Sequence, residues 1–144
     1  MDIAMIPITR PSLDNSDYRY IKQVLKSKIL TDGYFQQKTE KLLKKYIKSK
    51  FVALTHSCTA ALEISAILIN LKKNDEVIMP SYGFVSVANA IVLRGAKPIF
   101  ADINPLTLNI SYKDISKKIT KRTKAIYVIH YAGNSCEIDK ISTL

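Results

Sequence analysis

Short apolar runs alternate with helical patterns from residue 51 to residue 129 of this chain. Parallel strands need a crossover between them, usually a helix, so this alternation predicts a mostly parallel sheet with helices on both faces. We therefore expect an α/β fold class. The expected strands are 51–55, 76–79, 98–101 and 125–129, and the expected helices between them are 59–71, 85–93 and 112–119.

Two more helices are expected before the first strand, at 15–27 and 35–48, joined by a turn at Thr31-Asp-Gly33 in which the glycine would supply a positive φ. Residues 137–144 begin another amphipathic pattern, and the chain ends inside it. We expect an interrupted reading frame or a fragment. No repeat or linker divides the chain, so residues 1–144 are expected to form one incomplete domain, with no second domain.

The composition is typical of a globular protein, with 47% hydrophobic and 24% charged residues. No apolar run approaches the roughly 20 residues that span a bilayer, which excludes a membrane helix. Residues 1–7 lack the basic and apolar regions of a secretory signal, so a cytoplasmic location is expected.

The net charge of +10 raises the possibility of a nucleic-acid partner. The lysines of residues 38–50, however, fall mostly between apolar positions, which is the pattern of a solvated helix face. No helix-turn-helix or aromatic-basic RNA motif is present. We expect neither a nucleic-acid nor a membrane partner, and a positive field that attracts an anionic substrate.

Cysteine and histidine residues predict no catalytic or metal chemistry. Cys58 and Cys136 do not form a Cys-x-x-Cys pair and have no histidine at metal-ligand spacing, so both are expected to be small buried residues, and no metal is expected. His56 and His130 each follow an apolar run and are expected to be hydrogen-bonded structural groups.

One loop has the pattern of an anion site. The run 51–55 is followed by His56 and by Ser57-Cys-Thr-Ala60, which opens a helical pattern, and a helix start presents unpaired N–H groups that suit a phosphate. An ordinary N-cap explains the same residues, because Ser and Thr are preferred there and the glycines of a P-loop are missing. Tyr82 and Phe84 follow the second strand and are expected at the carboxyl edge of the sheet, where open α/β folds bind ligands.

Several segments carry a resemblance to a known family. They are His56-Ser-Cys-Thr-Ala-Ala-Leu62, Asp75-Glu-Val-Ile-Met-Pro-Ser-Tyr-Gly-Phe-Val85, Val92-Leu-Arg-Gly-Ala-Lys97, Asp102 and His130-Tyr-Ala-Gly133. In order and spacing they resemble the amino-terminal part of the DegT/DnrJ/StrS sugar aminotransferases. Within that family they are most similar to the dTDP-4-amino-4,6-dideoxygalactose transaminases of surface-polysaccharide synthesis.

The resemblance implies an incomplete PLP-transferase large domain, of the aspartate-aminotransferase type (fold type I), and pyridoxal 5'-phosphate as cofactor of the intact parent. Ser57, Cys58, Thr59 and Ala60 match the segment that grips the cofactor phosphate. Phe84 matches the ring that stacks on the pyridine, although Gly83 stands where the family pattern has threonine. Asp32 and Gly33 resemble a loop that family members place near the substrate.

The resemblance also implies what this chain lacks. A transaminase needs a lysine that bonds the cofactor and an acid that holds the pyridine nitrogen protonated. In the family both follow the part that this chain matches, so we assign no catalytic residue. The chain is expected to be inactive alone.

The intact parent is expected to be a homodimer that transfers an amino group from glutamate to a nucleotide-linked 4-keto-6-deoxysugar. The alternative is a small standalone phosphate- or nucleotide-binding α/β module that uses the Ser57–Ala60 helix start.

Overall fold

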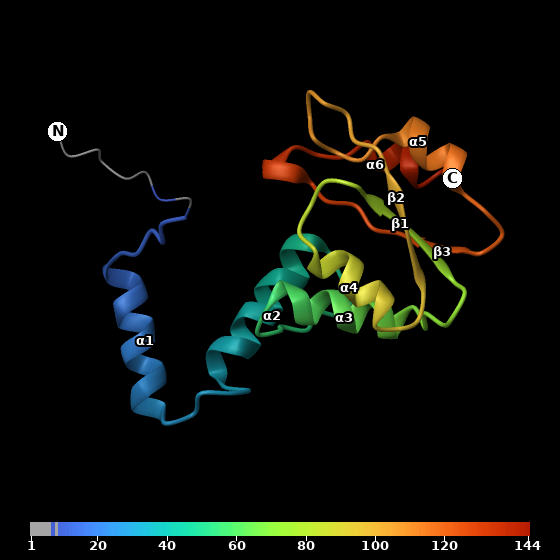
Figure 1. Cartoon of the computed structure of the whole chain (residues 1–144). Helices are drawn as coiled ribbons and strands as arrows, with labels where there is room; N and C mark the ends of the chain where they lie inside the picture. The colour runs from blue at the N-terminus through green and yellow to red at the C-terminus, as the bar shows by residue number, and fades with distance from the viewer. Residues whose placement is uncertain (1–6, 8) are drawn as a thin grey trace. The chain divides into compact units, whose positions relative to one another are not determined.

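A computed structural model describes residue 7 and residues 9–144, so most of the leader used to judge a secretory signal lies outside the described residues. The chain forms two compact units, Met1–Leu54 (unit 1) and Thr55–Leu144 (unit 2). In Figure 1 the described residues of unit 1 are coloured blue to teal, and unit 2 is coloured green to red. The assignment of residues 1–144 to one large domain stays a prediction. Among the described residues, no helix combines the length and the apolar character needed to cross a bilayer.

The described part of unit 1 contains two helices, α1 (Asn15–Ser27) and α2 (Tyr34–Ile47). A capping box starts α1: the Asp14 side chain accepts from Ser16 N–H at 2.6 Å, and Asp17 accepts from Asp14 N–H at 2.8 Å. The turn before α2 differs from the expectation, because Asp32, not Gly33, has the positive φ of 50°. Gly33 instead caps α2 with extended backbone, and the Gln36 amide supports Asp32 by bonding its N–H and its carboxylate.

Unit 2 is built on a parallel sheet of three strands in the order β2-β1-β3. They are β1 (Glu76–Pro80), β2 (Lys97–Ala101) and β3 (Thr123–Ile126). The predicted parallel sheet is confirmed, although β3 begins and ends earlier than expected. The expected strand at 51–55 is wrong: these residues form no strand. A strand requires a hydrogen-bonded neighbour, and the three described strands pair only with one another.

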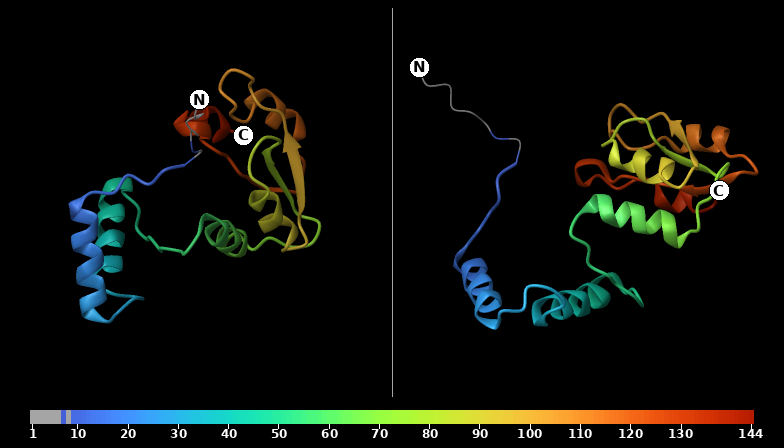
Figure 2. Two further views of the ribbon diagram at one scale, coloured as in Figure 1. Left: turned by 60° about the vertical axis from the view of Figure 1, so that its left-hand side comes forward. Right: turned by 60° about the horizontal axis from the view of Figure 1, so that its bottom comes forward.

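Helices cover both faces of this sheet, as predicted (Figure 2). On one face α3 (Cys58–Leu68) and α4 (Ser86–Val92) enclose a core with one set of alternate β1 side chains. The other face packs α5 (Tyr112–Lys118) and α6 (Ile138–Ile141) on Ile78. The first core contains Ala66, Leu71, Val77, Met79, Val87, Ile91 and Ala96, and the second contains Ile78, Ala101, Ile110, Ile115, Cys136 and Ile141.

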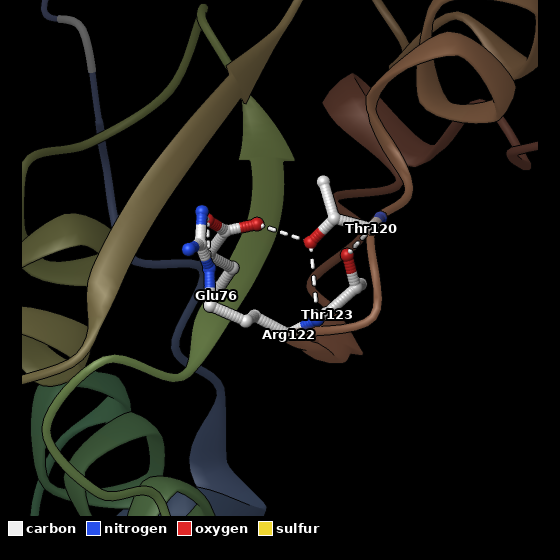
Figure 3. A network of polar contacts seen from close by, with 4 residues as sticks. All are labelled: Glu76, Thr120, Arg122 and Thr123. Atoms are coloured by element: carbon white, nitrogen blue, oxygen red, sulfur yellow. Dashed lines mark hydrogen bonds and ion pairs between the residues drawn. The ribbon is translucent and has the colours of Figure 1, made fainter.

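A polar cluster joins the amino ends of β1 and β3 (Figure 3). The Glu76 side chain is only 4% exposed. One carboxylate oxygen accepts from Arg122 Nε and Nη2 at 2.9 and 2.6 Å, and the other accepts from the Thr120 hydroxyl at 2.6 Å. Burying a carboxylate costs free energy unless it is paired and hydrogen-bonded, and Glu76 satisfies both conditions. The cluster therefore stabilises the amino edge of the sheet, opposite the edge at which the strands end.

Proline in β2 marks that strand as an edge of the sheet. Lys97 N–H donates to Asp75 O at 2.8 Å, so Lys97 faces β1 and the next residue, Pro98, faces away from it. Proline has no N–H to give to a neighbouring strand, so this position tolerates it only on the outer side. Pro98 therefore blocks a further ladder on β2.

Candidate functional site

The carboxyl ends of the strands meet at one edge of the sheet, because the ladders are parallel and Pro80 pairs with Ala101. The loop 81–85 leaves β1 at this edge and leads into α4 (Figure 1). Tyr82 and Phe84 lie in this loop, as predicted from their place after the strand. Phe84 is 75% exposed as a residue, so an aromatic face is available beside the sheet edge.

Helix α3 begins at the same edge. Its last turn connects to the amino end of β1 through residues 69–75, so the helix runs back along the strand. Eleven helical residues and five strand residues each extend roughly 16 Å, which brings the start of α3 level with the end of β1. Consistent with this, Leu62, Ser65 and Val87 line one recess of about 240 Å³ with residues 126–129.

The first turn of α3 has both engaged and unengaged donors. Ser57 is the N-cap: its hydroxyl accepts from Ala60 N–H at 3.1 Å, and its carbonyl accepts from Ala61 N–H at 3.1 Å. The N-cap interpretation therefore holds for Ser57, and the cap already uses the Ala60 amide. Among the described residues, the amides of Cys58 and Thr59 and the Thr59 hydroxyl donate to no partner.

These three donors suit an anion, because they meet at the positive end of the α3 dipole. Thr59 is exposed, so its hydroxyl and amide are accessible to a ligand. The four residues at 57–60 thus divide into two that build the helix start and two that present donors. Their binding of a cofactor phosphate stays a prediction.

The cysteines differ from the expectation in one respect. Cys58 is exposed at the start of α3, so its predicted burial is wrong; the core under this helix begins further along, at Leu62 and Ala66, and does not reach Cys58. Cys136 is buried as predicted, its Sγ–H donates to Ile129 O at 3.1 Å, and burial raises the pKa of its thiol. His130 Nδ1 accepts from Cys136 N–H at 3.0 Å, which confirms a structural role for this histidine.

Gly83 allows a close approach between the two loops of the edge. A Cβ at this position would lie 2.8 Å from Ile129 Cδ1, closer than real Cβ atoms come to other atoms. The threonine of the family pattern would therefore require Ile129 to change its rotamer.

Sequence reasoning gave no role to Tyr131, which the structure brings to Tyr82. The two rings lie 5.0 Å apart, and the Tyr131 hydroxyl donates to the Tyr82 hydroxyl at 3.1 Å. They are 49 residues apart in the chain, so no local pattern indicates the contact. The only available sign was that both lie in the segments of the family resemblance.

Asp32 and Gly33 belong to unit 1, and the residues of the sheet edge belong to unit 2. Their proposed place near a substrate stays a prediction. Within unit 1, the Asp32 carboxylate accepts from the Gln36 amide at 3.0 Å, so turn structure accounts for the local contacts of this residue.

The sequence model of the DegT/DnrJ/EryC1/StrS aminotransferase family matches residues 11–144, which is nearly the whole chain. The chain belongs to this family. The resemblance seen in the motifs is thereby confirmed, and so is the α/β aminotransferase fold.

Relatives of this aminotransferase-family chain are longer than it is. Uncharacterized protein MJ1066 of Methanocaldococcus jannaschii is 42% identical over 138 residues, which are 96% of this chain and 36% of that protein. GDP-perosamine synthase of Vibrio cholerae is 32% identical over 97% of this chain and 38% of its own length. The chain thus spans between a third and two fifths of these relatives.

A solved structure agrees with the fold. The putative sugar aminotransferase Spr1654 from Streptococcus pneumoniae, in its PLP form, matches with a TM-score of 0.89 and 28% identity. The match covers 96% of this chain and 35% of that one. The described architecture is therefore that of the matched third of a sugar aminotransferase that was solved in its PLP form.

Proposed function

We propose that this chain supplies the phosphate-binding helix start and the ring-stacking aromatic of a pyridoxal-phosphate aminotransferase that acts on a nucleotide-linked 4-keto-6-deoxysugar. The observation that carries the proposal is the set of unengaged donors at Cys58 and Thr59, at the same sheet edge as the exposed Phe84 ring. GDP-perosamine synthase and the PLP form of Spr1654 support the substrate class and the cofactor.

The residues present fit the cofactor. A phosphate requires several donors, and two amides and one hydroxyl are available at a helix start. The pyridine ring requires an apolar face, and Phe84 offers one, since the residue is 75% exposed. Pyridoxal phosphate, when bound, supplies the electron sink that amino transfer needs.

The roles of this chain's own residues follow from their positions. Thr59 and the Cys58 amide would hold the phosphate and so fix the cofactor at the edge of the sheet. Phe84 would cover one face of the ring, orient it and exclude water from that face. We assign no catalytic residue to this chain, and we place proton transfer in parts of family members beyond the matched third.

The wider setting is part of the same proposal. Glutamate would be the amino donor, the complete enzyme would be a homodimer, and it would act in the cytoplasm in surface-polysaccharide synthesis. The net charge of +10 favours the approach of an anionic nucleotide sugar. The sequence motifs indicate a thymidine nucleotide, and this stays a prediction.

Amide NMR spectra of the chain titrated with pyridoxal phosphate would test the proposal. We expect the signals of Cys58 and Thr59 to shift, pyridoxal without phosphate to shift them much less, and inorganic phosphate to compete. Thr59→Val should weaken binding about tenfold or more, because a hydrogen bond to a charged group contributes about 1.5–3 kcal/mol. The matched control is Thr39→Val, since the Thr39 hydroxyl donates only to Phe35 O in its own helix.

The ring-stacking role has its own control pair. Phe84→Leu should weaken binding about fivefold, since an aromatic pair contributes about 1 kcal/mol beyond its buried area. Phe51→Leu alters a similarly exposed phenylalanine in unit 1 and should have no effect. Cofactor-induced shifts that avoid both α3 and the 81–85 loop would overturn the proposal, as would the absence of any shift.

A further inference from the structure

The turn after residue 130 has a strained backbone at the carboxyl edge of the sheet. In the single 3₁₀ turn η1 (Tyr131–Gly133), Ala132 has φ 49° and Gly133 has φ 83°. Left-handed backbone is unfavourable for alanine because of its Cβ, so neighbouring contacts must hold the turn in place.

Asn109 supplies these contacts. Its residue is only 5% exposed, and its side chain bonds both ends of the turn. Oδ1 accepts from Tyr131 N–H at 2.9 Å, and Nδ2 donates to Asn134 O at 3.0 Å. Both polar groups of the buried amide are therefore satisfied by the backbone of the turn.

Asn109 is itself fixed in a second loop. Its carbonyl accepts from Asn104 N–H at 2.8 Å, and the adjacent Ile110 forms an antiparallel bridge with Ile103. The loop after β2 is thus connected through one side chain to the turn after β3. An amide between two well-anchored loops restrains both of them.

The restrained backbone of this turn also positions the Tyr131 ring. With its backbone held, Tyr131 reaches Tyr82 with its hydroxyl at 3.1 Å. Tyr82 lies two residues before Phe84 in the 81–85 loop. The other anchors of this loop are backbone bonds: Ser81 N–H donates to Ala101 O at 2.8 Å, Val87 N–H to Phe84 O at 3.3 Å and Asn89 N–H to Val85 O at 3.0 Å. The Tyr82 hydroxyl raises the pKa of Tyr131.

We propose that Asn109 is a positioning residue of the candidate cofactor site, which holds Tyr131 against Tyr82 and thereby restrains the loop that carries Phe84. The part that concerns the cofactor rests on the function proposed above. The restraint itself is a property of the unliganded chain and is open to test without any ligand.

The first experiment compares Asn109→Leu with Asn104→Leu in chains labelled at the tyrosine ζ carbon. Asn104 is in the same loop, but its side chain accepts only from Leu106 N–H. We expect Tyr131 to titrate above its ordinary pKa of 10.0 in the unaltered chain and in Asn104→Leu. In Asn109→Leu the shift should be lost, as in Tyr82→Phe, which removes the partner hydroxyl directly.

A folded Asn109→Leu chain that keeps the raised Tyr131 pKa would overturn the proposal. Should this variant not fold, hydrogen exchange in the unaltered chain decides. The Tyr131 amide should exchange more slowly than the Ser135 amide, which donates to no described residue. Equal exchange of the two amides would overturn the proposal.

A second arm, with pyridoxal phosphate, separates this proposal from the proposed function. Asn109→Leu should reduce the response of the Phe84 ring while the Thr59 amide still responds. Equal loss at both positions would overturn the positioning role and leave the site itself standing. Absence of any response in the unaltered chain would contradict the proposed function, while the tyrosine titration would still decide on the restraint.

Discussion

At the scale of single residues, the charge of Glu76 is the clearest link between sequence and stability. The Thr120 hydroxyl and then Arg122 hold the pKa of this carboxyl below its ordinary value of 4.5. A carboxyl whose pKa is lower in the folded state stabilises that state at pH values above the pKa that the carboxyl has in the unfolded chain. This contribution is lost as the pH falls through the folded value.

Glu76→Gln should therefore destabilise unit 2 near neutral pH and make its stability less sensitive to acid. Urea unfolding at about pH 7 and about pH 3 would measure both effects. Glu63→Gln is the control, because Glu63 is an exposed residue of α3 outside this cluster. If the free energy of unfolding fell by the same amount between the two pH values in Glu76→Gln as in the unaltered chain, the stabilising role of the Glu76 charge would be contradicted.

The core offers a second prediction at this scale. Ile78 is fully buried in the central strand β1, so Ile78→Ala should lower the free energy of unfolding by about 2–5 kcal/mol. Ile67→Ala removes the same atoms from a residue that is 54% exposed. This control should change the free energy of unfolding by less than about 0.5 kcal/mol. Chemical denaturation would measure the difference, and similar costs would show that Ile78 is not in a core.

At the scale of elements, a hydroxyl pair connects α3 to the end of the sheet. The hydroxyls of Ser65 and Tyr127 lie 2.9 Å apart, and no other polar side-chain pair joins this helix to the sheet among the described residues. Because α3 carries Cys58 and Thr59, this bond contributes to the place of the candidate phosphate donors.

A double-mutant cycle of Ser65→Ala and Tyr127→Phe should give a coupling energy of about 1 kcal/mol. Each change removes one hydroxyl and leaves the packing atoms in place, so the cycle isolates their interaction. Urea unfolding of the four chains would measure it. Additive effects would mean that helix packing alone positions α3.

At the scale of the whole molecule, the boundary between the two units predicts where proteases act. Residues 48–57 contain no helix or strand and include Lys48 and Lys50. Trypsin should cleave there first and release a fragment that retains the structure of unit 2, because exposed segments without secondary structure are cut most readily.

Mass spectrometry of early digests would identify the first cut. Replacing Lys48 and Lys50 with Gln should delay the appearance of this fragment without altering later cuts. A first cut beside Lys97 or Arg122, inside the sheet of unit 2, would contradict the division into units.

Local sequence was sufficient where local contacts decide the structure. Helix α1 begins and ends where predicted, because the capping box at Asp14 and the apolar spacing both depend on residues that are close together in the sequence. The parallel sheet was predictable too, since strand–helix alternation leaves few other topologies. The helix start at Ser57 was recognised for the same local reason.

Contacts distant in the chain decided the rest. Whether 51–55 pairs as a strand, whether Cys58 is covered, and whether Tyr82 finds Tyr131 all depend on residues far away in sequence. One difference was local: Asp32, and not Gly33, has the positive φ, and its hydrogen-bond partner Gln36 is only four residues away. Hydrophobic periodicity and sequence motifs contain no information on which distant residues come into contact.

The amino-acid sequence by itself thus determined the order of the α-helices and of the three paired strands, though not the strand expected at 51–55. It also determined the helix start at 57–60 and membership of the family, because spacing and caps act over a few residues. Only the tertiary structure decided which donors of that helix start remain unengaged and how Asn109 joins two loops around Tyr131. The physical reason is that hydrogen bonds are assigned by position in space, and folding brings together groups that the chain keeps apart.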